Sequence, residues 1–120
     1  MAPGVKALLP ALLLAGCATV PDGAEEPYRA LGTEPFWSIA IADGRMTYET
    51  PDGGFSVPAP RAEETGDGRI YRTRRITLHT WIAECSDGMS DRRYRDTVRA
   101  EVDGRTLNGC GGPYTEPYPA

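Results

Sequence analysis

Apolar and polar residues alternate along most of the chain, and Asp-Gly pairs separate the alternating segments at six places between residues 22 and 104. Asp-Gly between alternating segments is the strongest short-range signal for a β-hairpin, because both turn positions require positive φ. No stretch of about 10 residues or more has the apolar spacing of an amphipathic helix. The pattern predicts an all-β fold, a single small antiparallel barrel or sandwich of about six to eight strands.

The segment around Asp43-Gly44 predicts one hairpin with a definite register. A two-residue turn at this position brings the apolar residues of both strands to one face. The expected pairs are Ala42 with Arg45, Ile41 with Met46, Ile39 with Tyr48 and Trp37 with Thr50.

A second hairpin is predicted at Asp103-Gly104. On the strand before this turn, Asp96 interrupts the set of inward-facing residues, so it needs either a partner or a β-bulge. A further strand is expected over residues 76–83, where apolar and polar positions alternate. The second hairpin would pair Ala100 with Leu107 and Val98 with Gly109, with Tyr94 and Val102 on the same inward face.

The first 16 residues have the layout of a secretory signal peptide, with one positive charge at Lys6 before an apolar run that ends at residue 16. The run has about 10 residues, whereas a membrane-spanning helix needs about 20. Leu14-Ala15-Gly16-Cys17 resembles the lipobox of bacterial lipoproteins, in which the cysteine thiol accepts the lipid. An ordinary signal peptide that contains a cysteine is the alternative. We expect cleavage before Cys17 and acylation of Cys17, including palmitate.

The expected organisation follows from this cleavage site. Residues 1–16 would be the signal peptide, 17–27 the lipidated cysteine and a flexible linker, 28–112 the β domain, and 113–120 a Pro-rich tail. Two acyl chains anchor a protein stably, since each buried CH₂ contributes about 0.8 kcal/mol. Ala18 stands where an aspartate would resemble an inner-membrane retention signal, which favours the outer membrane with the domain in the periplasm. The linker reaches at most about 35 Å.

Composition and charge exclude several classes of function. The formal net charge of −4 argues against a general nucleic-acid binder. His79 is the single histidine, and a lone histidine without a paired nucleophile or a second ligand is usually structural. The sequence contains no Gly-rich phosphate loop, Cys-x-x-Cys or histidine pair. We therefore expect no metal, no cofactor and no enzymatic activity.

Cys85 and Cys110 remain once Cys17 is assigned to the lipid anchor. An even pair of cysteines in an exported domain predicts a disulfide. The bond would close a loop of about 25 residues and stabilise the domain by roughly 3–4 kcal/mol in the chain-entropy model. A small sheet domain with few aromatic residues benefits from such a bond.

Three segments contain unusual strings, and we call residues 32–37, 85–90 and 107–110 the motif segments. Over residues 28–112 the chain resembles a family of small, largely uncharacterised bacterial envelope proteins, many of them lipoproteins. The resemblance implies a compact β domain in the cell envelope and no established reaction. It rests on Gly32-Thr33-Glu34-Pro35-Phe36-Trp37, on Cys85-Ser86-Asp87-Gly88-Met89-Ser90 with Tyr94, and on Leu107-Asn108-Gly109-Cys110.

The first motif segment has two interpretations. In one, the Glu34 carboxylate lies in an apolar pocket and serves as an acid catalyst. In the other, which we favour, Pro35 starts an edge strand, Phe36 and Trp37 fill the core, and Glu34 caps a turn. Residues 85–90 are similarly expected to form an ordered turn locked by the disulfide, because their Ser and Asp side chains can hydrogen-bond the nearby backbone.

Eight of the twelve arginines fall into two groups, one within residues 69–75 and one within residues 92–99. If the strands that carry them are neighbours, they form a cationic face suited to carboxylates or phosphates. A solvated face with interleaved acidic residues is the simpler interpretation. The candidate binding residues are Arg93, Arg95, Arg99, Glu34 and Trp37.

These patterns together favour a non-enzymatic bacterial envelope lipoprotein. We expect its domain to bind a protein partner or an anionic envelope ligand, for example as an inhibitor of a cell-wall-degrading enzyme. A structural or assembly role at the outer membrane is the alternative. A small hydrolase that uses Glu34 is a third possibility.

The lipid anchor generates the first prediction. Replacing Cys17 with Ser removes the thiol that accepts the lipid, so the Cys17→Ser protein should incorporate no radioactive palmitate and should leave the membrane fraction. Unchanged fractionation with membranes would show that Cys17 is not the anchor.

Overall fold

The computed structural model describes residues 26–116, and every regular element in this range is a β-strand. The expected signal peptide and Cys17 lie outside the described residues. Within the described range there is no helix with the length and apolar character that crossing a membrane requires. The strands are β1 (Tyr28–Thr33), β2 (Phe36–Ala42), β3 (Arg45–Thr50), β4 (Gly53–Pro58), β5 (Glu63–Glu64), β6 (Gly68–Arg72), β7 (Ile76–Cys85), β8 (Arg93–Val102) and β9 (Arg105–Thr115).

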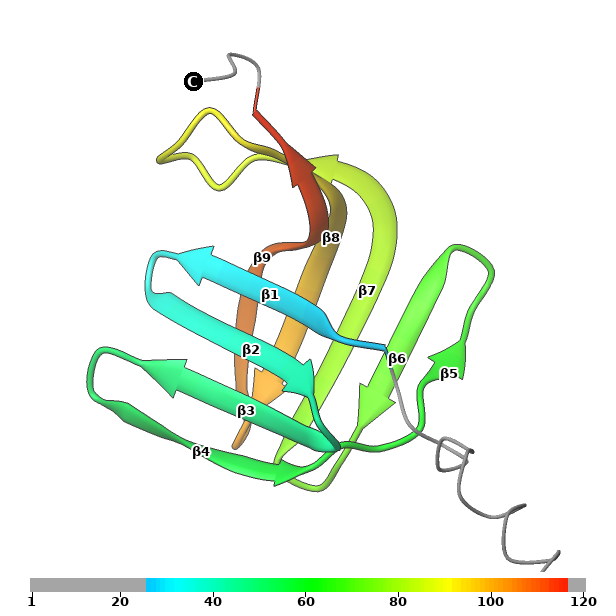
Figure 1. Ribbon diagram of the computed structural model, residues 1–120. Helices are drawn as coiled ribbons and strands as arrows, with labels where there is room; N and C mark the ends of the chain where they lie inside the picture. Colours follow the sequence, from blue (N-terminus) through cyan, green and yellow to red (C-terminus); the bar gives the residue numbers. More distant parts are fainter. Residues whose placement is uncertain (1–25, 117–120) are drawn as a thin grey trace, which may run out of the picture.

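The nine strands form one antiparallel sheet in the order β4-β3-β2-β1-β9-β8-β7-β6-β5. It consists of two meanders, β1–β4 and β5–β9, which are joined where β1 pairs with β9. The sheet curls into a half-barrel, in which the first meander crosses in front of the second (Figure 1). The predicted all-β antiparallel class is confirmed. The strands number nine, and one continuous sheet takes the place of the two sheets of a sandwich.

Both predicted hairpin registers are confirmed. The turn residues Asp43 and Asp103 have positive φ values of 54° and 48°, a conformation that aspartate tolerates because its short side chain can hydrogen-bond locally. The β2–β3 ladder ends at Ser38 and Glu49, one pair before the expected contact of Trp37 with Thr50. The confirmed pairs are Ala42 with Arg45, Ile41 with Met46, Ile39 with Tyr48, Ala100 with Leu107 and Val98 with Gly109.

The core lies between the two meanders and takes alternate residues from the strands, as the pleat of a sheet requires. One end of it is covered by Arg75, whose guanidinium carbon lies 3.5 Å from the ring centroid of Phe55 on edge strand β4. The same guanidinium donates two hydrogen bonds to Asp103 in the β8–β9 turn. The buried core residues are Ala30, Trp37, Ile39, Ile41, Met46, Tyr48, Tyr71, Ile76, Leu78, Val98, Ala100, Val102 and Leu107.

The predicted disulfide between Cys85 and Cys110 is confirmed, with the two Cα atoms 5.5 Å apart. Cys85 is the last residue of β7, and Cys110 lies in β9. Strand β8 lies between β7 and β9 in the sheet, so the covalent bond links two strands that share no ladder.

The contact of β1 with β9 is short, and two glycines make it possible. The paired residues are Ala30 with Gly111 and Leu31 with Cys110. A Cβ on Gly32 would overlap the Trp37 indole, and a Cβ on Gly109 would overlap the Leu31 carbonyl and lie 3.0 Å from Trp37 Cζ2. We call this junction, with the indole that packs on it, the β1–β9 seam.

The structure corrects part of the interpretation of residues 34–37. Trp37 is buried as expected, but Phe36 is 53% exposed because successive residues of β2 point to opposite faces. Strand β2 is internal, between β1 and β3, and Pro35 lies in the turn that precedes it. The side chain that was expected to fill the core therefore lies on the surface.

The strands extend slightly beyond the expected domain. At the N-terminal side the limits agree, since β1 begins at Tyr28, the first residue of the expected domain. β9 continues to Thr115, so residues 113–115 of the expected tail belong to the sheet.

Substitution of Gly109 tests the β1–β9 seam. Gly109→Ala places a Cβ against the Leu31 carbonyl and the Trp37 ring, and overpacking of this kind costs about 1–3 kcal/mol. Urea unfolding should therefore show a lower free energy of unfolding for this variant. Gly66→Ala is the matched control because a Cβ there meets no atom within 4 Å. Equal destabilisation by the two substitutions would contradict the role assigned to Gly109.

Candidate functional site

Two of the motif segments, residues 32–37 and 85–90, meet at one end of the half-barrel and line a groove of about 470 Å³. We call it the motif-end groove. The buried rings of Trp37 and Tyr94 contribute to its lining. Phe36 and Met89 also line it, yet they are 53% and 67% exposed. Exposed apolar side chains that share one groove, unlike single ones, are typical of surfaces that bind another protein.

The loop of residues 85–90 is the ordered turn that the sequence predicts. The Asp87 carboxylate accepts hydrogen bonds from the backbone amides of Met89 and Ser90, both at 2.9 Å, and from the Ser90 hydroxyl. The amides hold the pKa of Asp87 below its ordinary value. The Thr33 hydroxyl donates to the Asp87 carbonyl at 3.0 Å, which joins the loop to the β1–β2 turn. Met89 is thus presented by a structured loop.

A pair of tyrosines continues this end of the molecule along β8 and β9. The Tyr94 and Tyr114 ring centroids are 5.3 Å apart. The Arg92 guanidinium lies over the Tyr114 ring at 4.3 Å and also bonds Glu116 at 2.9 Å. These contacts fix the end of β9 against the loop that carries Met89.

Glu34 is exposed at the turn between β1 and β2. It borders a pocket of about 350 Å³ that Asp87 and Asn108 also line. The Asp87 carboxylate is already occupied by hydrogen bonds within its own loop. Because Glu34 is exposed to solvent, it does not lie in the apolar pocket that its interpretation as an acid catalyst requires.

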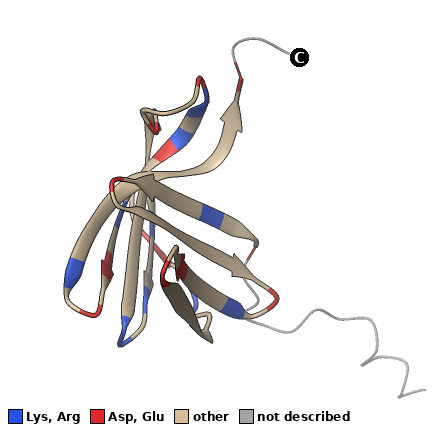
Figure 2. Ribbon diagram, turned by 90° about the vertical axis from the view of Figure 1, so that its left-hand side faces the viewer, with Lys and Arg blue, Asp and Glu red and all other residues tan. Residues whose placement is uncertain are grey.

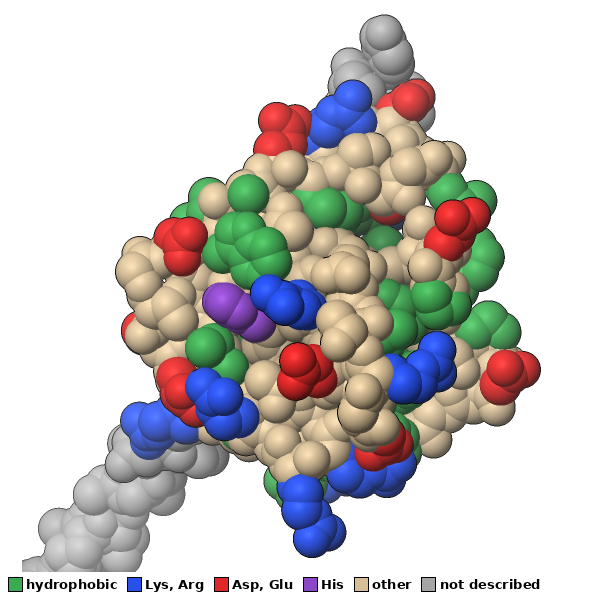
Figure 3. All heavy atoms as spheres, turned by 180° about the vertical axis from the view of Figure 1, so that it is seen from behind, with side chains coloured by type: hydrophobic (Ala, Val, Ile, Leu, Met, Phe, Trp, Pro, Cys, Tyr) green, Lys and Arg blue, Asp and Glu red, His purple; other side chains and the backbone are tan. Residues whose placement is uncertain are grey.

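The two arginine groups do not form one continuous cationic face. They belong mainly to β6 and β8, and β7 separates these strands. Arg93 lies 3.6 Å from Glu84, and Arg95 is bound to Asp96. Arg99 lies opposite His79, whose ring packs against Trp81 at 5.1 Å. Acidic and basic residues alternate over the ribbon and over the back face of the molecule (Figures 2 and 3).

Asp96 has both hydrogen-bond partners and a neighbouring β-bulge, the two features that could accommodate its inward position. The ladder of β8 and β9 shifts register between Tyr94 and Asp96, and this bulge turns the neighbouring Arg95 toward the Asp96 carboxylate. Asp96 is 2% exposed and accepts hydrogen bonds from Arg95 Nε at 2.7 Å and from the Tyr28 hydroxyl at 2.8 Å. Burial, and then the bond to Asp96, raise the pKa of Tyr28.

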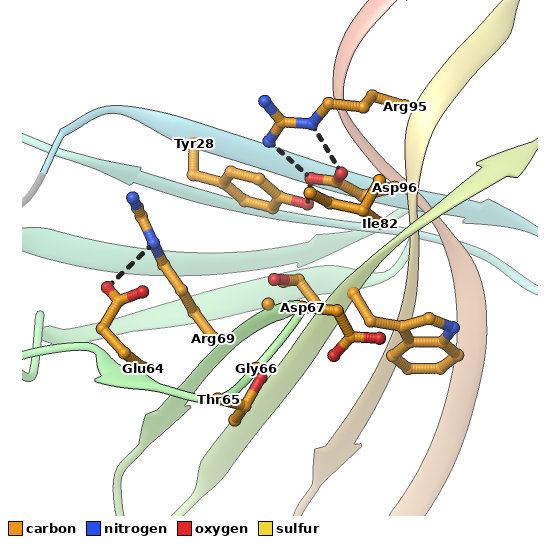
Figure 4. Close-up of a pocket in the computed structure, with 12 residues that line it drawn as sticks. Tyr28, Glu64, Thr65, Gly66, Asp67, Arg69, Ile82, Arg95 and Asp96 are labelled. Carbon is orange, nitrogen blue, oxygen red and sulfur yellow. Dashed lines mark hydrogen bonds and ion pairs between the residues drawn. The ribbon is translucent and has the colours of Figure 1, made fainter.

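Figure 4 shows Asp96 bonded to the Arg95 guanidinium, with Tyr28 between this pair and Arg69. These residues line two adjoining clefts at the end of the half-barrel where β1 begins. The sequence indicated Arg95 as a candidate binding residue and Arg69 only as part of an arginine group, and it did not indicate Tyr28. The one sequence signal for this polar cluster was that the alternation of β8 places Asp96 among the inward-facing residues. Within residues 26–116, no group of His, Cys, Asp and Glu side chains is arranged to hold a metal ion.

Comparisons of the chain with family models, with curated proteins and with solved structures gave no match. The function is therefore inferred from the geometry of the chain's own residues.

The Asp87 loop generates a pH prediction. Because the folded-state pKa of Asp87 is lowered, the hydrogen bonds to its carboxylate are fully present above the ordinary value of 3.8 and are lost as the pH falls through the lower, folded value. The backbone amide resonances of Met89 and Ser90 should shift with a midpoint below pH 3.8 in an NMR titration. Asp87→Asn should abolish this titration, whereas a midpoint at or above 3.8 would contradict the assignment.

Proposed function

We propose that this protein is an envelope lipoprotein, anchored through Cys17, whose β domain binds a partner protein in the motif-end groove. The observation that carries the proposal is the exposure of Phe36 and Met89 on a backbone that is otherwise held rigidly. The occupant is a protein segment that buries apolar side chains against these two residues. Catalysis by this chain is not part of the proposal.

Rigidity at the groove supports binding rather than simple exposure of apolar surface. Cys85, at the start of the loop, is bonded to Cys110, and the loop itself is closed by Asp87 and joined to Thr33. A surface ordered before binding loses little conformational entropy when the partner arrives. Methionine adapts its shape to an apolar partner, and an aromatic ring supplies a large contact area.

The direction of β1 places Phe36 away from the expected anchor. The linker from Cys17 joins β1 at Tyr28, whereas Phe36 follows Thr33 at the other end of this strand, although the groove runs along β1 as far as Arg29. Six extended residues span roughly 20 Å. A domain tethered at Tyr28 therefore carries Phe36 near the end of β1 that is farther from the tether.

Site-specific cross-linking tests this proposal. A photoreactive amino acid at position 36 or 89, introduced into the full chain in the cells that produce it, should give one discrete cross-linked protein that mass spectrometry identifies. Position 82 is the matched control, because Ile82 is 61% exposed but does not line the groove.

Two results decide the outcome. The cross-link from position 36 should weaken when Met89→Ser removes the neighbouring contact, and Ile82→Ser should leave it unchanged. The same products from positions 36, 89 and 82, or no product from positions 36 and 89, would overturn the proposal.

A further inference from the structure

A second cleft, of about 510 Å³, lies at the opposite end of β1, where the linker joins the domain. Its charged residues are Arg29, Arg69, Arg95 and Glu26. The three arginines come from β1, β6 and β8, so residues of both meanders line this one cleft. Arg69 and Arg95 each have an acidic partner, Glu64 and Asp96, which holds the guanidinium in place without using all of its N–H donors. The cleft therefore offers oriented hydrogen-bond donors rather than a large net positive charge.

The guanidinium of Arg95 is held in position by its neighbours. Its Nε and one terminal nitrogen donate to the two oxygens of buried Asp96 at 2.7 and 2.9 Å. The hydroxyl of Tyr28, on β1, donates to one of these oxygens. The remaining N–H groups of Arg95 make no hydrogen bond within residues 26–116. Arginine fixed by a carboxylate in this way retains donors for a second anion.

Arg69 and Arg29 supply donors from the other sides of the cleft. Arg69 contacts Glu64 through Nε at 3.2 Å and the Tyr71 hydroxyl through a terminal nitrogen at 3.4 Å. Its second terminal nitrogen makes no hydrogen bond within the described range. Arg29 is exposed and forms no ion pair with residues 26–116.

We propose that this cleft binds a phosphate group, carried either by a phospholipid or by a soluble phosphate ester. A phosphate has oxygens in several directions, so it can accept hydrogen bonds from three guanidinium groups at once, whereas one arginine satisfies a carboxylate bidentately. The cleft also has apolar lining from Pro27, Ala40, Ala42 and Pro113, which suits the carbon skeleton that bears the phosphate.

The place of the cleft makes a phospholipid available to it. Glu26 and Pro27 line the cleft, and the linker expected from Cys17 is only about ten residues long, so this end of the domain remains within about 35 Å of the anchor. The lipid source thus rests on the proposed tether. The phosphate chemistry itself does not depend on the tether or on the motif-end groove.

Native mass spectrometry of the full acylated chain in neutral detergent tests the inference. The probes are phosphatidylglycerol, diacylglycerol with the same acyl chains, and glycerol 3-phosphate. We expect binding of phosphatidylglycerol to exceed that of diacylglycerol. If the phospholipid binds and glycerol 3-phosphate does not, the ligand is a lipid; glycerol 3-phosphate alone would identify a soluble ester. Equal binding of phosphatidylglycerol and diacylglycerol, with no binding of glycerol 3-phosphate, would overturn the proposal.

Substitutions connect binding to the cleft. Arg29→Gln and Arg69→Gln together should weaken phosphate binding by about tenfold or more, since each charge-assisted hydrogen bond is worth about a factor of ten. Neither residue contacts Asp96, so the fold should be retained. Arg93→Gln is the matched control because Arg93 lies outside the cleft. Unchanged binding by the double variant would refute the site. Arg29 also lines the motif-end groove, so Phe36→Ser, which alters that groove and not the cleft, should leave phosphate binding unchanged.

Discussion

The fold depends on a short junction, because the two meanders of the sheet share only the β1–β9 ladder of Ala30 with Gly111 and Leu31 with Cys110. Because this ladder is so short, side-chain contacts must also hold the two meanders together. Trp37 packs over the junction from β2, and the disulfide attaches Cys110 to the end of β7. Tyr28 adds a hydrogen bond to Asp96 on β8. The motif segments are, for the most part, the residues that hold the two meanders together.

The local structure could be predicted from the sequence because Asp-Gly turns fix hairpin register over a few residues. The pairing of β1 with β9 could not, since the paired residues lie about 80 positions apart and nothing local specifies such a contact. The same limit applies to the motif segments. Their residue types suggested a disulfide and an ordered loop, both present. That Trp37 points inward and Phe36 outward follows from the phase of β2, which the alternation of Trp37, Ile39 and Ile41 already contained.

The seam explains Gly32, Gly109, Cys110 and Trp37, and the loop hydrogen bonds explain Asp87. The exposed residues of the motif segments remain without such a role. Phe36 and Met89 contribute little to the core, and their exposure costs solubility without a compensating contact inside residues 26–116. For the two arginine groups, the structure removes a feature that the sequence suggested. A cationic strip was suggested by their crowding in the sequence, but most have acidic partners, and only the curling of the sheet shows which of them share a cleft.

Asp96 connects the stability of the seam with the chemistry of the arginine cleft. A buried ion pair often contributes less to stability than apolar residues of the same size, and an apolar residue at position 96 would complete the inward set of β8. The carboxylate instead receives Tyr28 from β1 and Arg95 from the bulge. Gly112 leaves room for this carboxylate, since a Cβ there would lie 2.6 Å from Asp96 Oδ2. An apolar residue at position 96 would pack into the core, but the Arg95 guanidinium would then have no carboxylate to orient it. The interaction that closes the seam at this end of β1 therefore also positions the guanidinium that faces the cleft.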